Sequence, residues 1–470
     1  MANKPALNAE QKEAFKTIQK FLDHPGPDTF VLKGYAGTGK TFLMQCLAKW
    51  LDENERDFCL LASTGRASAV LRGKTGFDTR TVHGELYQFS KVDGDHAGIP
   101  EDASVDQYGQ MRLEFLLRKP DEEKRVYIVD ESSMLSSELS EDSLAAFGSG
   151  VLLDDFFNAV GSNKIIFVGD PCQLPPVGQV DSPSLNMKWL ARQHRMAITV
   201  TLETIERNTA DNDIPLMAMR IRQMLDEENW PLWPKIPAGN FKNVTLYPSR
   251  EDLFQKYLER YKAFGANGVL AIARSNATVQ NLNQAFRTAL YGMEDMPLQV
   301  GDVLLVNRNN YKVPLTNGDF ISIKNMGEII MKENMHFQWV TVKSLGSESE
   351  YELLLSLEIL YGSFSQFTKD QSRMLMIDFS NRMKKQGIKA NTAKYKEEMK
   401  KDDYLNCLQA NFGYIVTCHK AQGGEWDEVF LFLDNKMYGM PKPELFRWWY
   451  TAVTRAKKRL YLENEWWIGV

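Results

Sequence analysis

Cysteine is scarce in this chain of 470 residues and is nowhere spaced for a metal site or a disulfide framework. The five cysteines are Cys46, Cys59, Cys172, Cys407 and Cys418, with no CxxC pair among them. Zinc modules and small disulfide-stapled secreted domains depend on such pairs. The scarcity excludes both classes and favours a reducing compartment.

Long apolar runs are also missing. No stretch approaches the roughly 18 apolar residues that a membrane-spanning helix needs. The amino-terminal segment MANKPALNAEQK is polar and lacks the apolar core of a signal peptide. We therefore expect no membrane partner and a cytoplasmic protein.

Positive charge is not in excess, since 56 Lys and Arg stand against 61 Asp and Glu, a net charge of −5. Nucleic-acid-binding domains are often strongly basic, so any such site must be local here. With 43% hydrophobic and 25% charged residues, the chain is typical of a globular protein rather than a disordered one. Internal repeats and low-complexity tracts are absent.

Short β-branched and apolar runs alternate with helix-period segments in the first 200 residues. The predicted strands are 29–33, 58–62, 126–129 and 165–168, and an amphipathic helix over 8–20 precedes them. This alternation is typical of βαβ units, and so predicts an α/β fold with a parallel sheet. Ligands bind such sheets at the carboxyl ends of the strands.

A phosphate-binding loop follows the first predicted strand. Gly34-Tyr-Ala-Gly-Thr-Gly-Lys-Thr41 fits the pattern GxxxxGK[ST] between a strand and a helix. The backbone of Gly37, Thr38 and Gly39 can curl around phosphates, Lys40 can reach the β- and γ-phosphates, and Thr41 can hold Mg²⁺. We predict ATP and Mg²⁺ as cofactors.

Two carboxylates stand at the end of the third predicted strand. Asp130 would hold Mg²⁺ through water, and Glu131 would orient or deprotonate the attacking water. Phosphate binding combined with water activation indicates hydrolysis.

Further motifs, in order along most of the chain, resemble those of superfamily 1 helicases, and more closely the RecD-like and phage Dda-like branch that moves 5′ to 3′ on single-stranded DNA. The segments that carry the resemblance are LNAEQ at 7–11, ASTGRA at 62–67, TVH at 81–83, FVGDPCQLPPV at 167–177, YIVTCHKAQGGEW at 414–426 and WYTAVTRAK at 449–457.

The resemblance implies roles for single residues. At the nucleotide it implies Gln11 as the adenine-reading residue, Gln173 at the γ-phosphate, Glu425 at the ribose and Arg455 as the arginine finger. A second-lobe arginine is implied at Arg207, with Arg195 as a rival. The implied DNA-binding residues are Ser63, Thr64, His83, Thr417 and His419, and Tyr108 as the aromatic of a duplex-splitting wedge. Ser63 or Thr64 would serve equally well as a helix N-cap.

The implied fold has two RecA-like P-loop NTPase domains with a small hairpin insertion and an SH3-like β-barrel insertion. The predicted first domain is 1–83 with 124–196, and the second is 197–296 with 406–470. The hairpin module is 84–123, with possible strands at 104–107 and 111–116. The barrel strands are expected at 303–306, 320–323, 339–342 and 351–355 within 297–405. The basic helical segment 369–401 faces either DNA or solvent.

The predicted function is that of an ATP-dependent DNA helicase that translocates 5′ to 3′ and unwinds duplex. Its partners would be single-stranded DNA and its junctions with duplex, with replication or repair proteins possible. We expect a monomer in the cytoplasm of a bacterial or phage-infected cell, with the nucleoid as its location on DNA. The alternative is a P-loop ATPase or kinase with a client other than nucleic acid, which would not need the segment TAVTRAK.

Overall fold

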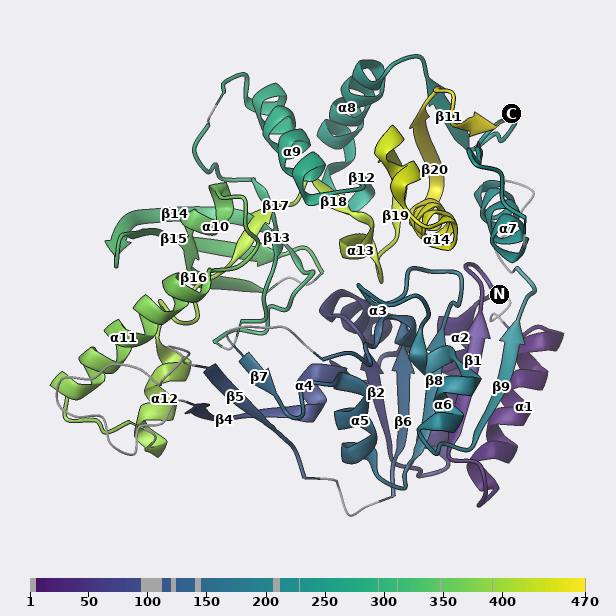
Figure 1. Cartoon of the computed structure of the whole chain (residues 1–470), viewed down its shortest axis with the longest axis horizontal. Helices are drawn as coiled ribbons and strands as arrows, with labels where there is room; N and C mark the ends of the chain where they lie inside the picture. Colours follow the sequence, from purple (N-terminus) through teal and green to yellow (C-terminus); the bar gives the residue numbers. More distant parts are fainter. Residues whose placement is uncertain are drawn as a thin grey trace, which may run out of the picture.

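The computed structural model describes residues 6–93, 112–119, 124–139, 145–205, 212–227, 229–294, 296–310, 312–346, 349–390 and 392–469. They form two α/β lobes, a β-arm and a β-rich module with a helical pair (Figure 1). Among these residues no helix is long and apolar enough to cross a bilayer.

The first lobe is built on a parallel six-stranded sheet in the order β3-β2-β6-β8-β1-β9. The strands are β1 (Thr29–Gly34), β2 (Phe58–Ala62), β3 (Thr79–Thr81), β6 (Val126–Asp130), β8 (Lys164–Gly169) and β9 (Ala197–Leu202). The helices are α1 (Ala9–Asp23), α2 (Lys40–Glu53), α3 (Gly65–Thr75), α4 (Val82–Leu86), α5 (Leu152–Val160) and α6 (Met187–Arg192), with 3₁₀ turns η1 (Ser132–Met134) and η2 (Pro183–Leu185).

Apolar residues fill both faces of this sheet, as the predicted buried strands require. Phe30 and Leu32 pack in the cluster beneath α1 and α2, while Val31 between them packs with the residues of α5. The predicted boundary at 196 is wrong, because β9 pairs along its length with β1 and so belongs to the first lobe.

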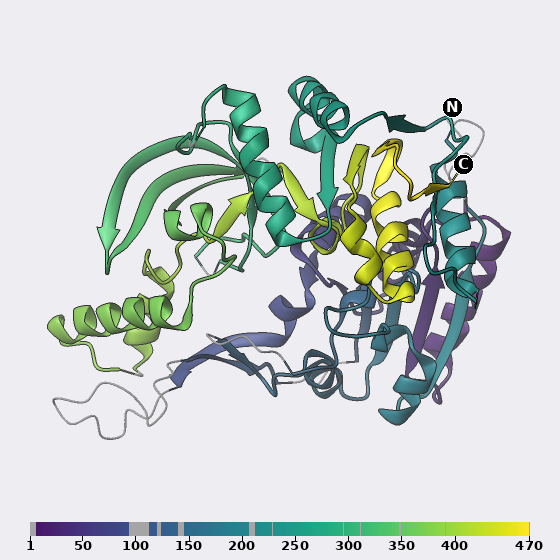
Figure 2. The ribbon, with the colours of Figure 1, turned by 45° about the horizontal axis from the view of Figure 1, so that its top comes forward.

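A β-arm leaves the first lobe as β4 (Tyr87–Asp93), β5 (Arg112–Leu117) and β7 (Ala145–Phe147). β4 runs antiparallel to β5, and β7 runs parallel to it. An antiparallel strand pair thus lies within the predicted segment 84–123, but β5 pairs with 87–93. The predicted strand at 104–107 and Tyr108 lie outside the described residues. In Figure 2 the arm extends toward the helical pair α11 (Lys369–Lys385) and α12 (Ala393–Lys401).

The second lobe is built on a parallel sheet in the order β11-β20-β19-β12-β18. The strands are β11 (Val244–Tyr247), β12 (Val269–Ala273), β18 (Ile415–Thr417), β19 (Trp426–Phe432) and β20 (Ala456–Glu463), with a small separate pair β10 (Ile236–Pro237) and β21 (Ile468–Gly469). The helices are α7 (Ile214–Asp226), α8 (Arg250–Gly268), α9 (Asn276–Tyr291), α13 (Cys418–Ala421) and α14 (Lys442–Val453), with the 3₁₀ turn η3 (Asn435–Gly439).

The β-rich module is an antiparallel sheet in the order β16-β15-β14-β13-β17. Its strands are β13 (Val303–Val306), β14 (Phe320–Lys332), β15 (Met335–Ser344), β16 (Glu350–Ser356) and β17 (Ala410–Phe412), and α10 (Leu357–Tyr361) follows β16. A bridge between Leu355 and Leu408 joins the edge strand β16 to the chain that enters β17, and so closes the sheet on itself. Since β17 lies at 410–412, the predicted boundary at 406 is too early.

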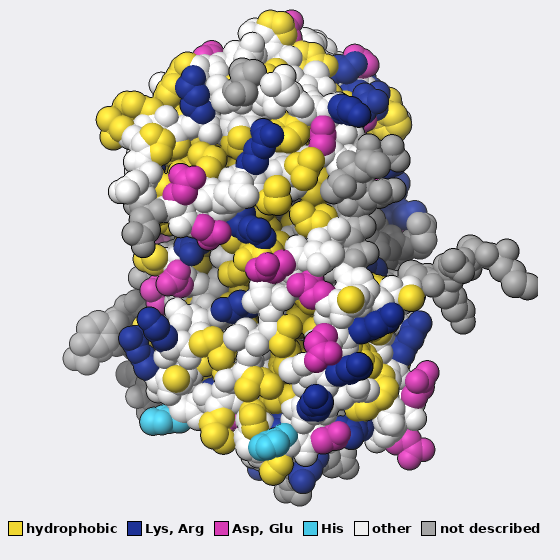
Figure 3. Space-filling model, turned by 90° about the vertical axis from the view of Figure 1, so that its right-hand side faces the viewer, with side chains coloured by type: hydrophobic (Ala, Val, Ile, Leu, Met, Phe, Trp, Pro, Cys, Tyr) yellow, Lys and Arg dark blue, Asp and Glu magenta, His cyan; other side chains and the backbone are white. Residues whose placement is uncertain are grey.

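The surface shows why the bulk charge is uninformative. On the face in Figure 3, basic and acidic side chains are interspersed over both lobes rather than gathered by sign. This face therefore shows no patch of a single charge.

Candidate nucleotide site and nucleic-acid cavities

The phosphate-binding loop joins β1 to α2, and two of its glycines adopt the positive φ angles that the turn requires. Gly37 and Gly39 have φ of 83° and 77°, in the left-handed region that favours glycine. Lys40 begins α2, and its Nζ donates to the carbonyl oxygens of Gly34 at 2.6 Å and Tyr35 at 3.1 Å. The loop therefore directs the first N–H groups of α2 toward one point, which suits an anion.

A cavity of about 600 Å³ lies over this loop and is lined from both lobes. The predicted residues that line it are Gly37, Gly39, Lys40, Thr41, Asp130, Glu131, Gln173, Glu425 and Arg455. Thr38 is buried instead, with its hydroxyl donating to the Tyr35 carbonyl oxygen at 2.8 Å. Residues up to 418 positions apart are thus brought together, from Gly37 to Arg455.

The two carboxylates at the end of β6 differ in their environments. Burial, and then the charge of Glu131, raise the pKa of Asp130 to about 7, although Lys40 opposes the shift. Glu131 adopts φ 49°, and its Oε2 is buried without a hydrogen-bond partner among the described residues. A buried oxygen without a partner fits a bound water or metal-bound water. With the Thr41 hydroxyl, these oxygen donors fit Mg²⁺.

Motif residues after β8 connect this cavity to the second lobe. Gln173 is 3% exposed, and its Oε1 has no hydrogen-bond partner among the described residues. Asp170 is fully buried, and burial raises its pKa. Its carboxylate accepts from the Tyr450 hydroxyl at 2.7 Å and from the Cys172 N–H at 2.9 Å.

Hydrogen bonds from the second lobe reach the phosphate-binding loop itself. The Tyr450 hydroxyl that donates to Asp170 also accepts from the Ala36 N–H at 2.9 Å. Nearby, the Leu174 N–H donates to Thr451 Oγ1 at 3.0 Å, and Gln422 donates to the Leu174 carbonyl oxygen at 3.0 Å. The sequence motifs contain these residues, but their pairing across the lobes could not be read from the sequence.

Arg455 lies at the cavity edge and is 4% exposed. Its guanidinium donates to the carbonyl oxygens of Thr451 at 3.0 Å and Gly424 at 3.1 Å, and to Thr454 Oγ1 at 3.2 Å. An arginine held at the mouth of a phosphate site can meet the charge of a γ-phosphate by turning away from these carbonyls.

Two of the predicted residues, Gln11 and Arg195, do not line the cavity. Gln11 is 2% exposed and does not line the cavity: its amide accepts from the Asn8 N–H in a capping box and donates to the Thr38 carbonyl oxygen at 3.0 Å. Arg207 lies outside the described residues. Its rival Arg195 bonds Thr29 and Asp28 at the start of β1, at the end of the strand away from the phosphate-binding loop.

A second cavity, of about 370 Å³, contains four of the predicted DNA-binding residues. Ser63, Thr64, His83 and His419 line it. Thr64 also caps α3 by accepting from the Ala67 N–H at 3.2 Å, so the capping interpretation is correct for this residue. Burial lowers the pKa of both histidines, which leaves them neutral near pH 7.

The positive charge of the second cavity comes from residues outside the predicted set. Arg66, Arg308 and Lys420 line it. Arg308 Nη2 is buried without a partner among the described residues, and Lys420 donates to Asn317 Oδ1 at 2.6 Å. Three cations in one groove fit a nucleic-acid backbone, and the sequence shows them only as isolated basic residues.

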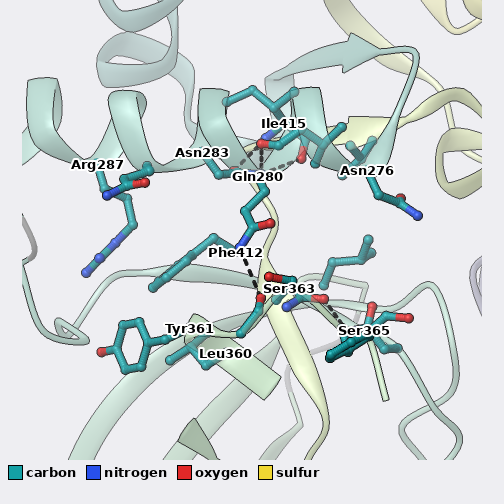
Figure 4. Close-up of a pocket in the computed structure, with 18 of the residues that line it drawn as sticks. Asn276, Gln280, Asn283, Arg287, Leu360, Tyr361, Ser363, Ser365, Phe412 and Ile415 are labelled. Atoms are coloured by element: carbon teal, nitrogen blue, oxygen red, sulfur yellow. Dashed lines mark hydrogen bonds between the residues drawn. The ribbon is translucent and has the colours of Figure 1, made fainter. Parts of the chain in front are cut away.

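A third cavity, of about 620 Å³, lies between α9 and the β-rich module and contains the predicted Thr417 (Figure 4). Asn307 and Lys420 line both this cavity and the second one, so the two adjoin. In Figure 4 Gln280 points from α9 toward the loop of Ser363, and its amide donates to the Gly362 carbonyl oxygen at 3.1 Å.

Comparison with known proteins finds two family models that match separate parts of the chain. A family model described as an AAA domain matches residues 6–228, and one described as a UvrD-like helicase C-terminal domain matches 412–462. The uncharacterized protein R530 of Acanthamoeba polyphaga mimivirus is 22% identical, over 97% of this chain and 99% of its own length. The ATP-dependent RecD2 DNA helicase of Deinococcus radiodurans is 25% identical over 92% of this chain, which spans only 46% of that protein.

Among solved structures, the fold is similar to that of Pif1 helicase in a structure of DNA unwinding at forked duplex, with a TM-score of 0.52 at 15% identity over 98% of this chain and 92% of that chain. Bacteroides Pif1 in complex with ADP-AlF3 and single-stranded DNA gives a TM-score of 0.50 at 15% identity, over 98% and 93% of the two chains. In sequence and in fold, the chain is therefore similar to superfamily 1 helicases of the RecD and Pif1 type.

Proposed function

We propose that this chain is an ATP-dependent DNA helicase that moves 5′ to 3′ along single-stranded DNA and opens duplex ahead of it. The observation that carries the proposal is that a phosphate-site cavity and a cationic cavity are each lined by residues from both sides of the lobe interface. A change in the fit between the lobes would alter both cavities together. The direction is carried by the family resemblance.

The roles at the nucleotide follow from position. Lys40 and the N–H groups of α2 would bind the β- and γ-phosphates, and Thr41 with Asp130 would hold Mg²⁺, which would supply charge neutralisation. Glu131 has a free carboxylate oxygen with which to orient a water or accept its proton. Arg455 would complete the site from the second lobe, while Gln173 would sense the γ-phosphate.

The cycle of ATP binding and hydrolysis would use the fact that the two lobes contribute different residues to the nucleotide site. Phosphate contacts from both lobes favour the closed arrangement, and hydrolysis removes part of that preference. If the lobes grip the DNA backbone unequally as they close and open, the strand advances. Hydroxyls at Ser63, Thr64 and Thr417 and the cations of the second cavity offer backbone contacts without sequence specificity.

Both cavities are completed within one chain, so we expect a monomer to be active on single-stranded DNA and on its junctions with duplex. The test is ATP hydrolysis measured with and without single-stranded DNA, with Lys40→Ala as the control. We expect stimulation by DNA, and no hydrolysis from Lys40→Ala in either condition. Hydrolysis that DNA does not change would contradict the proposal and favour an ATPase with another client.

A further inference from the structure

Arg66 stands in the wall between the nucleotide cavity and the cationic cavity. Among the described residues, it alone lines both. It is the second residue of α3, directly after the Thr64 cap, and so its backbone is fixed to the first lobe. Its position raises the question of what the side chain contacts beyond that lobe.

The Arg66 guanidinium packs against two aromatic rings from the other parts of the molecule, and these rings also contact each other edge to face with their centres 6.0 Å apart. Its central carbon lies 4.1 Å from the ring centre of Trp426, which begins β19 of the second lobe. It lies 5.0 Å from the ring centre of Phe320, which begins β14 of the β-rich module. Trp426 and Phe320 are 0% and 4% exposed. One side chain thus joins three parts of the fold through stacking that only a planar cation provides.

On the side of the nucleotide cavity, Arg66 packs against the backbone of Gly424. A Cβ at Gly424 would lie 2.4 Å from Arg66 Nε, so the backbone of residue 424 presses directly on the guanidinium. The Gly424 carbonyl oxygen accepts from Arg455 at 3.1 Å. When Arg455 turns toward a γ-phosphate, it must release this carbonyl, and the peptide that touches Arg66 loses its anchor.

On the side of the cationic cavity, Gly65, the residue before Arg66, packs against the turn at 316–319. A Cβ at Gly65 would lie 1.5 Å from Thr316 Oγ1, in the turn that also carries Asn317 and Gly318 of the cavity wall. Asp319 in this turn accepts from Thr316 N–H at 2.7 Å. Burial lowers the pKa of Arg66 to about 10, with Asp319 opposing and Arg455 adding to the shift, so the guanidinium remains charged near pH 7.

We propose that Arg66 is the positioning residue that couples nucleotide occupancy to grip on DNA: packed against both Trp426 and Phe320, it transmits the release of Gly424 by Arg455 to the turn at 316–319. This inference rests on the proposed function. Coupling of this kind is a free energy shared by two sites, so each ligand must change the affinity of the other by the same factor.

The experiment measures that factor in both directions. Affinity for fluorescent oligothymidylate is titrated with and without a non-hydrolysable ATP analogue and Mg²⁺, and affinity for the analogue with and without oligothymidylate. We expect a change of about fivefold or more in the native chain, equal in both directions. Arg66→Met keeps an apolar chain against the rings without the charge, and should bring the factor to about one.

Arg308→Met is the matched control, because Arg308 lines the cationic cavity and not the nucleotide cavity. It should weaken DNA binding alike with and without the analogue, and so preserve the coupling factor. Phe320→Leu removes one of the two rings that Arg66 contacts and should reduce the factor as well, which covers the case that Arg66→Met does not fold.

Each result has a distinct meaning. If the factor is unchanged in Arg66→Met and in Phe320→Leu, the coupling role is overturned while the helicase proposal stands. If the native chain binds DNA with the same affinity in both nucleotide states, the coupling role is overturned too. If the native chain binds no DNA, the proposed function fails, and this inference fails with it.

Discussion

The hydroxyl of Tyr450 offers a test of how the two lobes are held together at the nucleotide site. It accepts from the Ala36 N–H at 2.9 Å and donates to Asp170 Oδ2 at 2.7 Å, and both Tyr450 and Asp170 are buried. Tyr450→Phe removes one oxygen atom and keeps the ring. The Asp170 carboxylate then loses the hydrogen bond from residue 450 and keeps the one from the Cys172 N–H.

The expected cost is that of a hydrogen bond to a buried charged group, about 1.5–3 kcal/mol. Each factor of ten in an equilibrium constant corresponds to about 1.4 kcal/mol. The equilibrium constant for docking of the two lobes should therefore fall by a factor of about 10 to 150. Since both lobes line the nucleotide cavity, the dissociation constant of an ATP analogue should rise by about that factor. Titration of a fluorescent analogue measures it.

Tyr395→Phe is the matched control, because the Tyr395 hydroxyl is also bonded, to Ser380 at 2.8 Å, but within the helical pair far from this site. Its nucleotide affinity should equal that of the native chain. An affinity of Tyr450→Phe within about twofold of the native value, less than 0.5 kcal/mol, would refute the reasoning.

Three further predictions concern single residues. Glu131→Gln should lower turnover about 100- to 10,000-fold in single-turnover assays while the affinity for an ATP analogue is retained, and near-native turnover would exclude Glu131 as the residue that activates water. Burial lowers the pKa of Lys420 to about 8, so its charge is lost as pH rises through 8, and affinity for single-stranded DNA should then fall in the native chain but not in Lys420→Arg. In the free chain the unfolded state binds more protons above pH 8, so this group's contribution to the free energy of unfolding should rise between about 8 and 10.5. Gly65→Ala forces a Cβ onto Thr316 Oγ1; it should cost about 1–3 kcal/mol in a melting experiment and weaken DNA binding, and a native melting curve would contradict this packing.

Much of the fold could be predicted from local sequence patterns. The phosphate-binding loop could be predicted because its glycines, lysine and threonine are contiguous, and the strand runs around it alternate between two buried faces. The strand predicted at 303–306 has the bounds of β13, and the strand predicted at 351–355 lies within β16 (Glu350–Ser356), since β-branched and aromatic runs there are bounded by turn residues.

The remaining errors have physical causes. β9 reads as an isolated apolar run, and only pairing with β1 assigns it to the first lobe. β4 follows directly on α4 without a turn signal, so its pairing with β5 could not be read locally. The adenine-reading role of Gln11 stays a prediction; what the sequence did not show is that its amide also bonds the helix cap and the Thr38 carbonyl oxygen.

The contacts across the lobes were beyond sequence reasoning altogether. Tyr450 bonds a residue 414 positions away, and nothing in its neighbourhood marks the hydroxyl as a link between two domains. The sequence likewise shows Arg66 only as a basic residue on a helix, and the packing of Trp426 and Phe320 against it appears only in the structure. Such residues become visible only when three separate parts of the chain are packed together.

The measurement that tests the central claim most directly is ATP-dependent unwinding of matched duplexes that carry only a 5′ or only a 3′ single-stranded tail, with Lys40→Ala as the control. The account predicts unwinding from the 5′ tail alone and none with Lys40→Ala. Unwinding from the 3′ tail alone would contradict the proposed direction, and no unwinding from either tail would contradict the helicase activity itself.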